Sequence, residues 1–265
     1  MDPMRPHPLH VSTWGEGPDV VFLHGLGASS RYWENFAAVS NGYRATAPDL
    51  LGFGRSPAPP DSAYDVDAHL AALLPVLPDE AVVVAHSTGA ILAAALAVRH
   101  PARVRSLLLL GLPAYPDEHA ALVCVAGLGL LAKLTVEGRP SARWLCESMC
   151  RARPIAIALA PFVIRDLPPS IASDAARHTW VSYSRTLRRV VVEHRAVDDL
   201  LAAGAPVRLL HGEQDRGAPA KFVAELGERA QLAGRAIAVD FVEGDHHLAV
   251  RRPDVVADAL NIRRA

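Results

Sequence analysis

Short apolar runs alternate with longer amphipathic stretches along most of the chain. Six runs are strand-like and end at turn residues: 19–25, 43–50, 80–86, 104–111, 206–212 and 237–244. They are almost continuously apolar, which is typical of parallel strands buried on both faces of a sheet. Five stretches between or after them have helical patterns: about 30–39, 65–77, 88–99, 219–232 and 254–263. This alternation predicts an α/β fold with a doubly wound, mostly parallel sheet.

The alternation is interrupted once, between Ala114 and Gly204. The only strand-like run there, VVVEH (190–194), is weak against the helical pattern around it. We therefore expect a helical insertion between two strands of the core. The predicted division of the chain is a first part of the core over 1–113, the insertion over 114–204 and the second part of the core over 205–265.

One uncharged run inside the insertion extends from Ala120 to Ala132, and His119 and Lys133 enclose it. It is shorter than the roughly 20 residues that a membrane-spanning helix requires. Its two glycines also weaken it as a free-standing helix. The run is therefore interpreted as a buried or lid helix, with a membrane-anchored helix as the alternative.

Composition narrows the class of protein. The chain has 265 residues, 51% of them hydrophobic, which is enough for a large core. Its net charge of −1 gives no indication of a nucleic-acid partner or of a membrane partner. The three cysteines are an odd number bunched in mid-chain, and the first ten residues, MDPMRPHPLH, lack the apolar segment of a secretory signal. We expect a cytoplasmic protein with a small-molecule substrate, in an oligomeric state that the sequence leaves open.

Reactive side chains follow several of the predicted strands. In open α/β sheets, ligands bind at the carboxyl ends of the strands. Ser87 follows the strand at 80–86, Asp215 follows the strand at 206–212, and His246 and His247 follow the last strand. A hydroxyl, a carboxylate and an imidazole can act as a nucleophile, an orienting acid and a general base.

Four segments together give the chain a family resemblance: HGLG (24–27), DLLGFGRS (49–56), AHSTG (85–89), and HGEQD (211–215) followed by GDHHLAVRRP (244–253). In this order they resemble the α/β-hydrolase family, over essentially the whole length of the chain. The resemblance implies the α/β-hydrolase fold, in which the insertion is a helical cap over the nucleophile. It also implies a tight turn, the nucleophile elbow, that presents the nucleophile above the sheet.

The resemblance assigns the nucleophile to Ser87. The elbow usually reads G-x-S-x-G, and Ala85 stands at the first glycine, where it is still small enough. The oxyanion hole is expected to consist of the backbone N–H groups of Leu26 and Thr88. The alternative for Ser87 is an ordinary N-cap of the helix that follows it.

For the acid and the base, the resemblance favours Asp215 and His246. Glu213 and Asp117 are the competitors for the acid, but no carboxylate stands directly after the strand at 104–111. His246 precedes a proline by seven residues, as the base usually does in relatives, although Asp245 replaces the usual glycine before it. His247 is expected to pack at the edge of the loop or to line the pocket.

The other histidines and the cysteines suggest no further chemistry. His24 is interpreted as a structural histidine of its turn, and His86 as a residue that merely precedes the nucleophile. Cys146 and Cys150 are one helical turn apart and are interpreted as buried small side chains. The order of the reactive residues fits a triad without metal, so neither a metal nor a cofactor is expected.

The inner face of the cap is expected to select the substrate. Five residues offer apolar or aromatic surface there: Trp144, Met149, Phe162, Trp180 and Tyr183. These side chains fit a hydrophobic acyl or ring-bearing substrate, or else the core of the cap itself. From Lys133 to Arg195 there are 11 basic and 5 acidic residues. This excess is interpreted as a solvated helix face, with preference for an anionic substrate as the alternative.

The predicted function is that of a serine hydrolase acting on a carboxylic ester, lactone or thioester through an acyl-enzyme. A serine at the elbow disfavours the dehalogenase and epoxide-hydrolase branches, which place aspartate there. Two alternatives stay open. The same triad can serve carbon–carbon bond hydrolysis or the rearrangement or cyclisation of a biosynthetic intermediate, and a hydrolase-like scaffold can serve as a non-enzymatic ligand-binding module.

Overall fold

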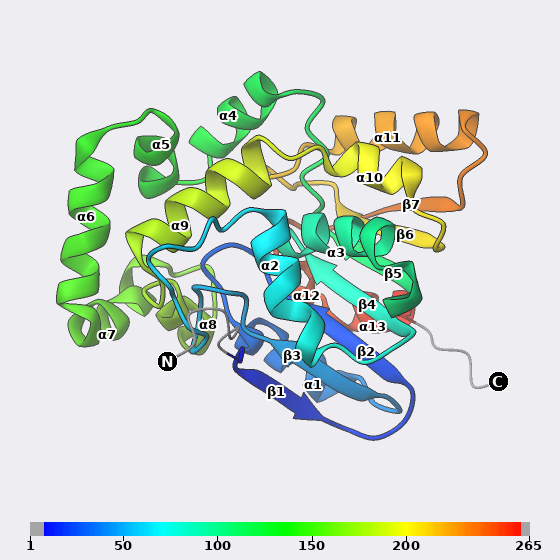
Figure 1. Ribbon diagram of the computed structural model, residues 1–265, viewed down its shortest axis with the longest axis horizontal. Helices are drawn as coiled ribbons and strands as arrows, with labels where there is room; N and C mark the ends of the chain where they lie inside the picture. The colour runs from blue at the N-terminus through cyan, green and yellow to red at the C-terminus, as the bar shows by residue number, and fades with distance from the viewer. Residues whose placement is uncertain (1–7, 261–265) are drawn as a thin grey trace.

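A seven-stranded sheet forms the centre of the molecule (Figure 1). The computed structural model describes residues 8–260. The strands are β1 (Val11–Trp14), β2 (Asp19–Leu23), β3 (Arg44–Pro48), β4 (Ala81–His86), β5 (Val104–Leu110), β6 (Val207–Gly212) and β7 (Ile237–Val242). Their order is β1-β3-β2-β4-β5-β6-β7, and every neighbouring pair is parallel except β1 with β3. The predicted α/β fold with a mostly parallel sheet is confirmed.

Both faces of the sheet are buried. Val21 and Val83 belong to one apolar cluster, whereas their neighbours Val20 and Val84 belong to a second cluster on the other face. This explains why the central strands read as continuous apolar runs. The helices that contribute to the first cluster include α2 (Val66–Leu73), α3 (Thr88–Arg99) and α11 (Ala220–Leu232). Those that contribute to the second are α1 (Glu34–Val39), α12 (Leu248–Arg251) and α13 (Pro253–Leu260), with Ile171 from the insertion.

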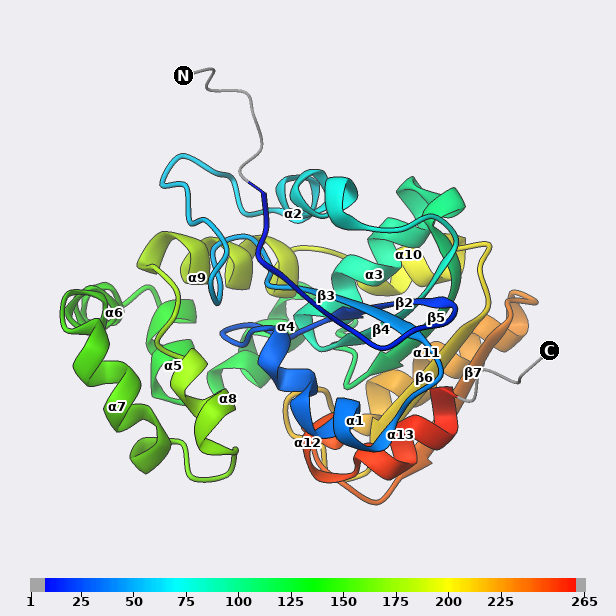
Figure 2. The same ribbon diagram turned by 90° about the horizontal axis from the view of Figure 1, so that it is seen from below.

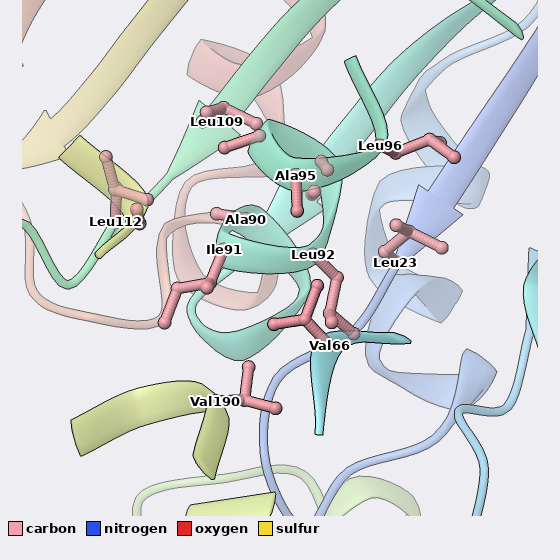
Figure 3. Packing of buried hydrophobic residues seen from close by; sticks show 14 of the residues in the cluster. Leu23, Val66, Ala90, Ile91, Leu92, Ala95, Leu96, Leu109, Leu112 and Val190 are labelled. Atoms are coloured by element: carbon pink, nitrogen blue, oxygen red, sulfur yellow. The ribbon is translucent and has the colours of Figure 1, made fainter. Parts of the chain in front are cut away.

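Helix α3 lies in the middle of the first cluster and is the most deeply buried helix of the core. Its residues from Thr88 to Ala97 are all buried. Figure 3 shows its leucine and isoleucine side chains among Leu23 of β2, Leu109 of β5, Val66 of α2 and Val190 of the insertion. Small alanine side chains allow these elements to approach closely. The N-terminus of α3, and with it Ser87, is therefore held rigidly at the end of β4.

The segment between β5 and β6 is helical, as predicted. It comprises α4 (Glu118–Ala126), α5 (Leu130–Val136), α6 (Pro140–Arg151), α7 (Arg153–Val163), α8 (Pro169–Asp174), α9 (Trp180–Thr186), a π-helical stretch (Leu187–Val192) and α10 (Ala196–Ala202). The run at 190–194 therefore forms no strand. Figures 1 and 2 both place α5, α6 and α7 at the end of the molecule away from β6 and β7. Helix α10 instead packs against α3 of the core.

The uncharged run from Ala120 to Ala132 is not the single helix that its composition suggested. It is divided between the end of α4 and the start of α5, with Gly127 and Gly129 in the connection. Gly129 has a φ of 138°, a conformation that other residues rarely adopt. No helix among residues 8–260 combines the length and the apolar character needed to cross a membrane.

The remaining differences from the sequence prediction lie at the edges of the fold. Strand β1 was not predicted, because an edge strand of four half-exposed residues has no continuous apolar run. The helix expected at 30–39 begins with a 3₁₀ turn (Ser30–Trp33) before α1. Of the helix expected at 254–263, α13 accounts for the part up to Leu260, and residues 261–263 lie outside the described residues.

Candidate active site

Ser87 occupies a strained turn between β4 and α3. Its φ of 53° and ψ of −118° lie in a region that costs a non-glycine residue of the order of 1–3 kcal/mol. Its backbone N–H donates to the carbonyl of Leu110 at 3.0 Å. Although Ser87 is at the N-cap position, its side chain makes no capping hydrogen bond to α3. The hydroxyl is therefore left available for another role.

Two glycines allow the backbone to pass closely around this turn. A Cβ atom on Gly89 would lie 2.5 Å from the carbonyl oxygen of Leu23. A Cβ atom on Gly25 would lie 2.9 Å from Nδ1 of His86 and 3.2 Å from Cβ of Ser87. A side chain on Gly89 would push α3 away from β2, and one on Gly25 would clash with His86 and Ser87, so the glycines fix the sharpness of the turn.

Asp215 and His246 form a buried acid–base pair. Nδ1 of His246 donates to Oδ2 of Asp215 at 2.8 Å. The other carboxylate oxygen of Asp215 accepts from the backbone N–H groups of Gly217 at 2.8 Å and Ala218 at 2.9 Å. Burial would raise the pKa of Asp215, but the hydrogen bond and charge of His246, the Ala218 amide and His211 together outweigh it, so the pKa lies below its ordinary value. An ionised Asp215 can only accept this hydrogen bond, so it favours the imidazole tautomer with the proton on Nδ1 and a lone pair on Nε2.

The end of β5 joins this pair to the turn at Ser87. Leu110 accepts the hydrogen bond from the Ser87 amide, and the next residue is Gly111. A Cβ atom on Gly111 would lie 3.0 Å from Nδ1 of His246 and 3.1 Å from Oδ2 of Asp215. Two consecutive residues therefore contact the serine backbone on one side and the acid–base pair on the other. The structure thus places the Ser87 turn and the Asp215–His246 pair on either side of Leu110 and Gly111, at the carboxyl ends of the parallel strands.

The two competing carboxylates lie elsewhere. Asp117 is exposed, and its side chain caps α4 by accepting from the amide of Ala120 at 2.8 Å. Glu213 is also exposed, whereas Asp215 is only 6% exposed. Among these three residues, Asp215 is the one whose carboxylate contacts His246.

The backbone amides expected to form the oxyanion hole belong to Thr88, directly after Ser87, and to Leu26. Thr88 is the first residue of α3, and the first amides of a helix have no acceptor within the helix. Leu26 follows Gly25, whose backbone passes directly beside the Ser87 side chain. The positive end of the α3 dipole adds to the preference for negative charge at this position.

His247 has different hydrogen-bonding contacts from His246. Its backbone N–H donates to Oδ1 of Asp245 at 2.9 Å, and its Nδ1 is buried without a partner in the described structure. Its ring lies 6.0 Å from the ring of Tyr32 and 5.7 Å from that of His86. Burial, reinforced by the charge of His246, lowers the pKa of His247 to about 4. It is therefore a neutral side chain at physiological pH, packed behind the acid–base pair.

His86 has a contact that the sequence analysis missed. Its Nε2–H donates to the backbone carbonyl of His246 at 2.8 Å, and its ring stacks on that of Tyr32 with centroids 4.5 Å apart. Burial, together with the neighbouring His246 and His247, lowers its pKa well below the ordinary value. His86 therefore holds the backbone of the histidine loop. The only indication in the sequence was that His86 directly precedes Ser87 at the end of β4, which places its side chain close to the candidate site.

The cap residues expected to line the pocket fall into two groups. Tyr183 is buried and stacks on His178 with ring centroids 4.9 Å apart, and Met149 and Trp180 are half-buried. Trp144 and Phe162 are 68% and 71% exposed on α6 and α7, the helices that lie away from the core strands. Their side chains are on the outer surface of the cap rather than packed inside it.

Leu128 is the cap residue that the structure places beside the acid–base pair. It lies in the connection between α4 and α5. A Cβ atom on Gly217 would lie 3.0 Å from Cδ2 of Leu128 and 3.4 Å from Cε1 of His246, so both side chains border the same glycine. Sequence analysis missed Leu128, for which the only signal was its position between two glycines.

The other candidate residues have structural contacts. His24 donates from Nδ1 to the carbonyl of Gly25 at 2.8 Å and accepts from the amide of Leu50 at Nε2, as expected for a structural histidine. Cys146 is buried and Cys150 is half-buried, and both are free thiols. Between residues 8 and 260, no cluster of three or more His, Cys, Asp or Glu side chains could hold a metal ion.

Comparison with the sequences of known proteins identifies several relatives of this chain. The chain is 29% identical over 253 residues to the probable lysophospholipase BODYGUARD 4 of Arabidopsis thaliana, a match that covers 86% of this chain and 59% of that protein. It is 34% identical over 101 residues to the pimeloyl-[acyl-carrier protein] methyl ester esterase of Aeromonas hydrophila, covering 38% of this chain and 40% of the esterase. The chain thus spans about three fifths or less of these relatives.

A solved structure and a family comparison extend this result. The crystal structure of E-2-(acetamidomethylene)succinate hydrolase superposes with a TM-score of 0.70 at 20% identity, covering 96% of this chain and 93% of that one. At this identity, the likeness concerns the fold alone. Residues 20–259 match the sequence model of the alpha/beta hydrolase family. The chain therefore belongs to the alpha/beta hydrolase family.

Proposed function

We propose that this protein is a serine hydrolase that cleaves a carboxylic ester, lactone or thioester of a hydrophobic substrate through an acyl-enzyme. The observation that carries the proposal is the 2.8 Å contact between His246 and Asp215 beside the strained Ser87 turn. A hydroxyl free of capping bonds, a base with a fixed tautomer and a buried acid are the parts that acyl transfer needs.

In the proposed reaction, Ser87 Oγ attacks the substrate carbonyl while Nε2 of His246 accepts its proton. Asp215 keeps Nδ1 protonated and stabilises the imidazolium that forms. The oxyanion that develops accepts hydrogen bonds from the amides of Leu26 and Thr88. Loss of one such donor typically costs about 3–4 kcal/mol of transition-state stabilisation.

His246 next acts as an acid to complete acylation, and then as a base for the attack of water. His246 donates its proton to the leaving alcohol or thiol, which departs and leaves the acyl group on Ser87. Water then enters, His246 removes its proton, and hydroxide adds to the acyl carbonyl. Collapse of this second tetrahedral intermediate releases the carboxylic acid and returns the proton from His246 to Ser87.

A hydrophobic acyl group fits the surroundings of His246. Leu128 offers an apolar side chain beside the histidine, because both border Gly217. The names of the two relatives, a probable lysophospholipase and a methyl ester esterase, are consistent with an ester substrate.

A substrate panel tests the proposed function. Purified protein is assayed with p-nitrophenyl esters of increasing acyl length, with the matching acyl thioesters and with a diketone. We expect ester or thioester turnover that rises with acyl length, and rapid mixing should show a burst of p-nitrophenol stoichiometric with enzyme, because an acyl-enzyme accumulates. Turnover of the diketone alone would replace ester hydrolysis with carbon–carbon bond hydrolysis. Binding of a ligand without any turnover would favour a binding module.

Asp215→Asn is expected to lower kcat by roughly 10⁴-fold, as the analogous change does in another triad. The asparagine oxygen can still accept from the Gly217 and Ala218 amides, so the loop keeps its shape. Its NH₂ group instead faces Nδ1 of His246, which must then carry a lone pair. The histidine proton moves to Nε2, and the ring can no longer accept the proton of Ser87.

Steady-state kinetics and thermal unfolding of the same variant check this result. Glu213→Gln is the matched control, because it removes a nearby carboxylate that is exposed, and it should leave kcat near that of the wild type. If Asp215→Asn folds and turns over normally while Glu213→Gln does not, the acid is Glu213 rather than Asp215.

A further inference from the structure

Exposed apolar side chains are concentrated on the cap. Twelve large hydrophobic residues of the described chain are exposed, and eight of them lie between Val123 and Val163. Single exposed apolar residues are ordinary on protein surfaces, whereas a contiguous group marks a surface that binds something. Five of the eight are on α6 and α7 and are called the cap patch here: Trp144, Ile155, Leu159, Phe162 and Val163.

Helix α7 shows most clearly that this surface has no partner within the described chain. None of its residues is buried. Ile155, Leu159, Phe162 and Val163 follow a spacing of four, three and one, so they share one face of the helix. Their exposed fractions range from 53% to 79%. A helix that packs on its own domain turns such an apolar stripe inward, whereas α7 turns its stripe outward.

The charges around the patch are mainly positive. Residues 133–165 contain six basic and two acidic residues, a net charge of +4 in a chain whose total is −1. Glu137 is paired with Lys133 and Arg139, and Glu147 is paired with Arg143 and Arg151. Both carboxylates are therefore neutralised, and the side chains of Arg139, Arg143 and Arg151 remain 65–72% exposed.

We propose that the cap patch docks on the surface of an anionic lipid bilayer. An apolar stripe with a phenylalanine on one face of α7, in a segment whose net charge is positive, is the combination that enters the region between lipid headgroups and acyl chains. A second copy of the chain fits less well, because two copies meeting through this face would bring two positive surfaces together. The docked helices would neither cross the bilayer nor need to do so.

The proposed docking also suits the proposed function. Helix α6 follows α5 directly, and α5 begins two residues after Leu128, which borders the same glycine as His246. A bilayer at the cap patch would bring hydrophobic acyl chains to the same helical segment between β5 and β6 that contains Leu128. The inference itself concerns binding and does not depend on the reaction.

Sedimentation with vesicles tests the proposal. Wild-type protein is mixed with vesicles of phosphatidylcholine alone and of phosphatidylcholine with phosphatidylglycerol. We expect cosedimentation with the anionic vesicles, weakened by added salt. The double variant Ile155→Ser/Val163→Ser should partition about tenfold or more weakly, because two apolar side chains no longer enter the lipid. The matched control Val39→Ser/Leu232→Ser changes two exposed apolar residues outside the patch and should bind as the wild type does.

Two further readouts separate the possible outcomes. Hydrolysis of a soluble short-chain ester should be equal in the wild type and both double variants, so a failure of the proposed function and a failure of docking are distinguishable. Light scattering should show the same mass for all three proteins. A wild-type protein that does not bind anionic vesicles, or a patch variant that binds equally well, overturns the proposal. A wild-type dimer that the patch variant alone dissociates would assign the patch to self-association instead.

Discussion

Ser87→Ala is expected to abolish turnover and labelling by a fluorophosphonate probe while leaving the fold intact. The hydroxyl makes no capping bond to α3, so its removal takes away little stability. Alanine must adopt the same φ of 53° as serine, so the strain of the turn is unchanged. Loss of a catalytic serine in another triad enzyme lowers kcat by about 10⁶-fold, and we expect a loss of this order.

The same variant separates the two interpretations of Ser87. If the serine were only an N-cap, its replacement by alanine would cost about 1 kcal/mol of folding free energy and would leave labelling unchanged. If Ser87 is the nucleophile, the variant loses labelling in gel and keeps its free energy of unfolding in urea. If Ser87 is only an N-cap, the variant keeps labelling and loses stability. Ser173→Ala is a suitable control, since its hydroxyl bonds a carbonyl of α8 far along the chain from the turn. A folded Ser87→Ala protein that is still labelled at one site would remove Ser87 from the mechanism.

The pattern of the sequence was sufficient for the central part of the fold. Strands β2, β4, β5 and β6 are short apolar runs because most of their residues are buried. These four strands, with β3 and β7, were all predicted within two residues at each end. Strand β1 was missed because its hydrogen bonds to β3, and not its side chains, define it. Apolar patterning detects burial, and β1 is not fully buried.

The boundaries between helices were harder to predict in the segment between β5 and β6. The run from Ala120 to Ala132 is uniformly uncharged, so it carries no periodicity that would indicate where one helix ends. Its division at Gly127 and Gly129 depends on the cost of glycine in a helix and on the packing of α4 against α5. The cost of glycine can be inferred from the sequence, but the packing of α4 against α5 is a tertiary contact that the local sequence does not indicate.

The candidate site could be predicted as a set of strand ends, but its internal contacts could not. The rule that ligands bind at the carboxyl ends of parallel strands selected Ser87, Asp215 and the two histidines 246 and 247, and the family resemblance favoured His246. The role of His86 depends on a hydrogen bond to a backbone carbonyl 160 residues away, which leaves no mark on the local sequence. The opposite error concerns Trp144 and Phe162, where aromatic character suggested an inner face and the structure has an outer one.

The average charge of the chain also concealed a local feature. The net charge of −1 gives no reason to expect an anionic partner, whereas the basic excess counted from Lys133 to Arg195 left an anionic substrate open as an alternative. Screening limits the reach of surface charges to about 10 Å at moderate ionic strength, so a partner at the cap responds to the local charge. The proposed docking on an anionic bilayer therefore depends on the positive charge of segment 133–165 and not on the net charge of the chain.

His246→Ala is expected to abolish acylation, whereas His247→Ala should leave it largely intact. The Nδ1 of His246 is bonded to Asp215 at 2.8 Å, and removal of this ring deprives Ser87 of its base. The ring of His247 has no hydrogen bond to Asp215 in the described structure and packs near Tyr32, and its pKa of about 4 keeps it neutral at the pH of the assay. Its loss should alter the packing behind the histidine loop and change KM more than kcat.

Single-turnover labelling of both variants decides between the two histidines. The two substitutions are at consecutive positions of the same loop, and each removes one imidazole. Each variant therefore serves as the control for the other. We expect a rate of acylation near zero for His246→Ala and within about tenfold of the wild type for His247→Ala, a difference of 1.4 kcal/mol or less in activation free energy. A dead His247→Ala beside a normal His246→Ala would move the base by one residue. Normal labelling of both would contradict the triad itself, because the Ser87 hydroxyl would then react without either imidazole, and a ligand-binding module would become the better explanation of the strained turn.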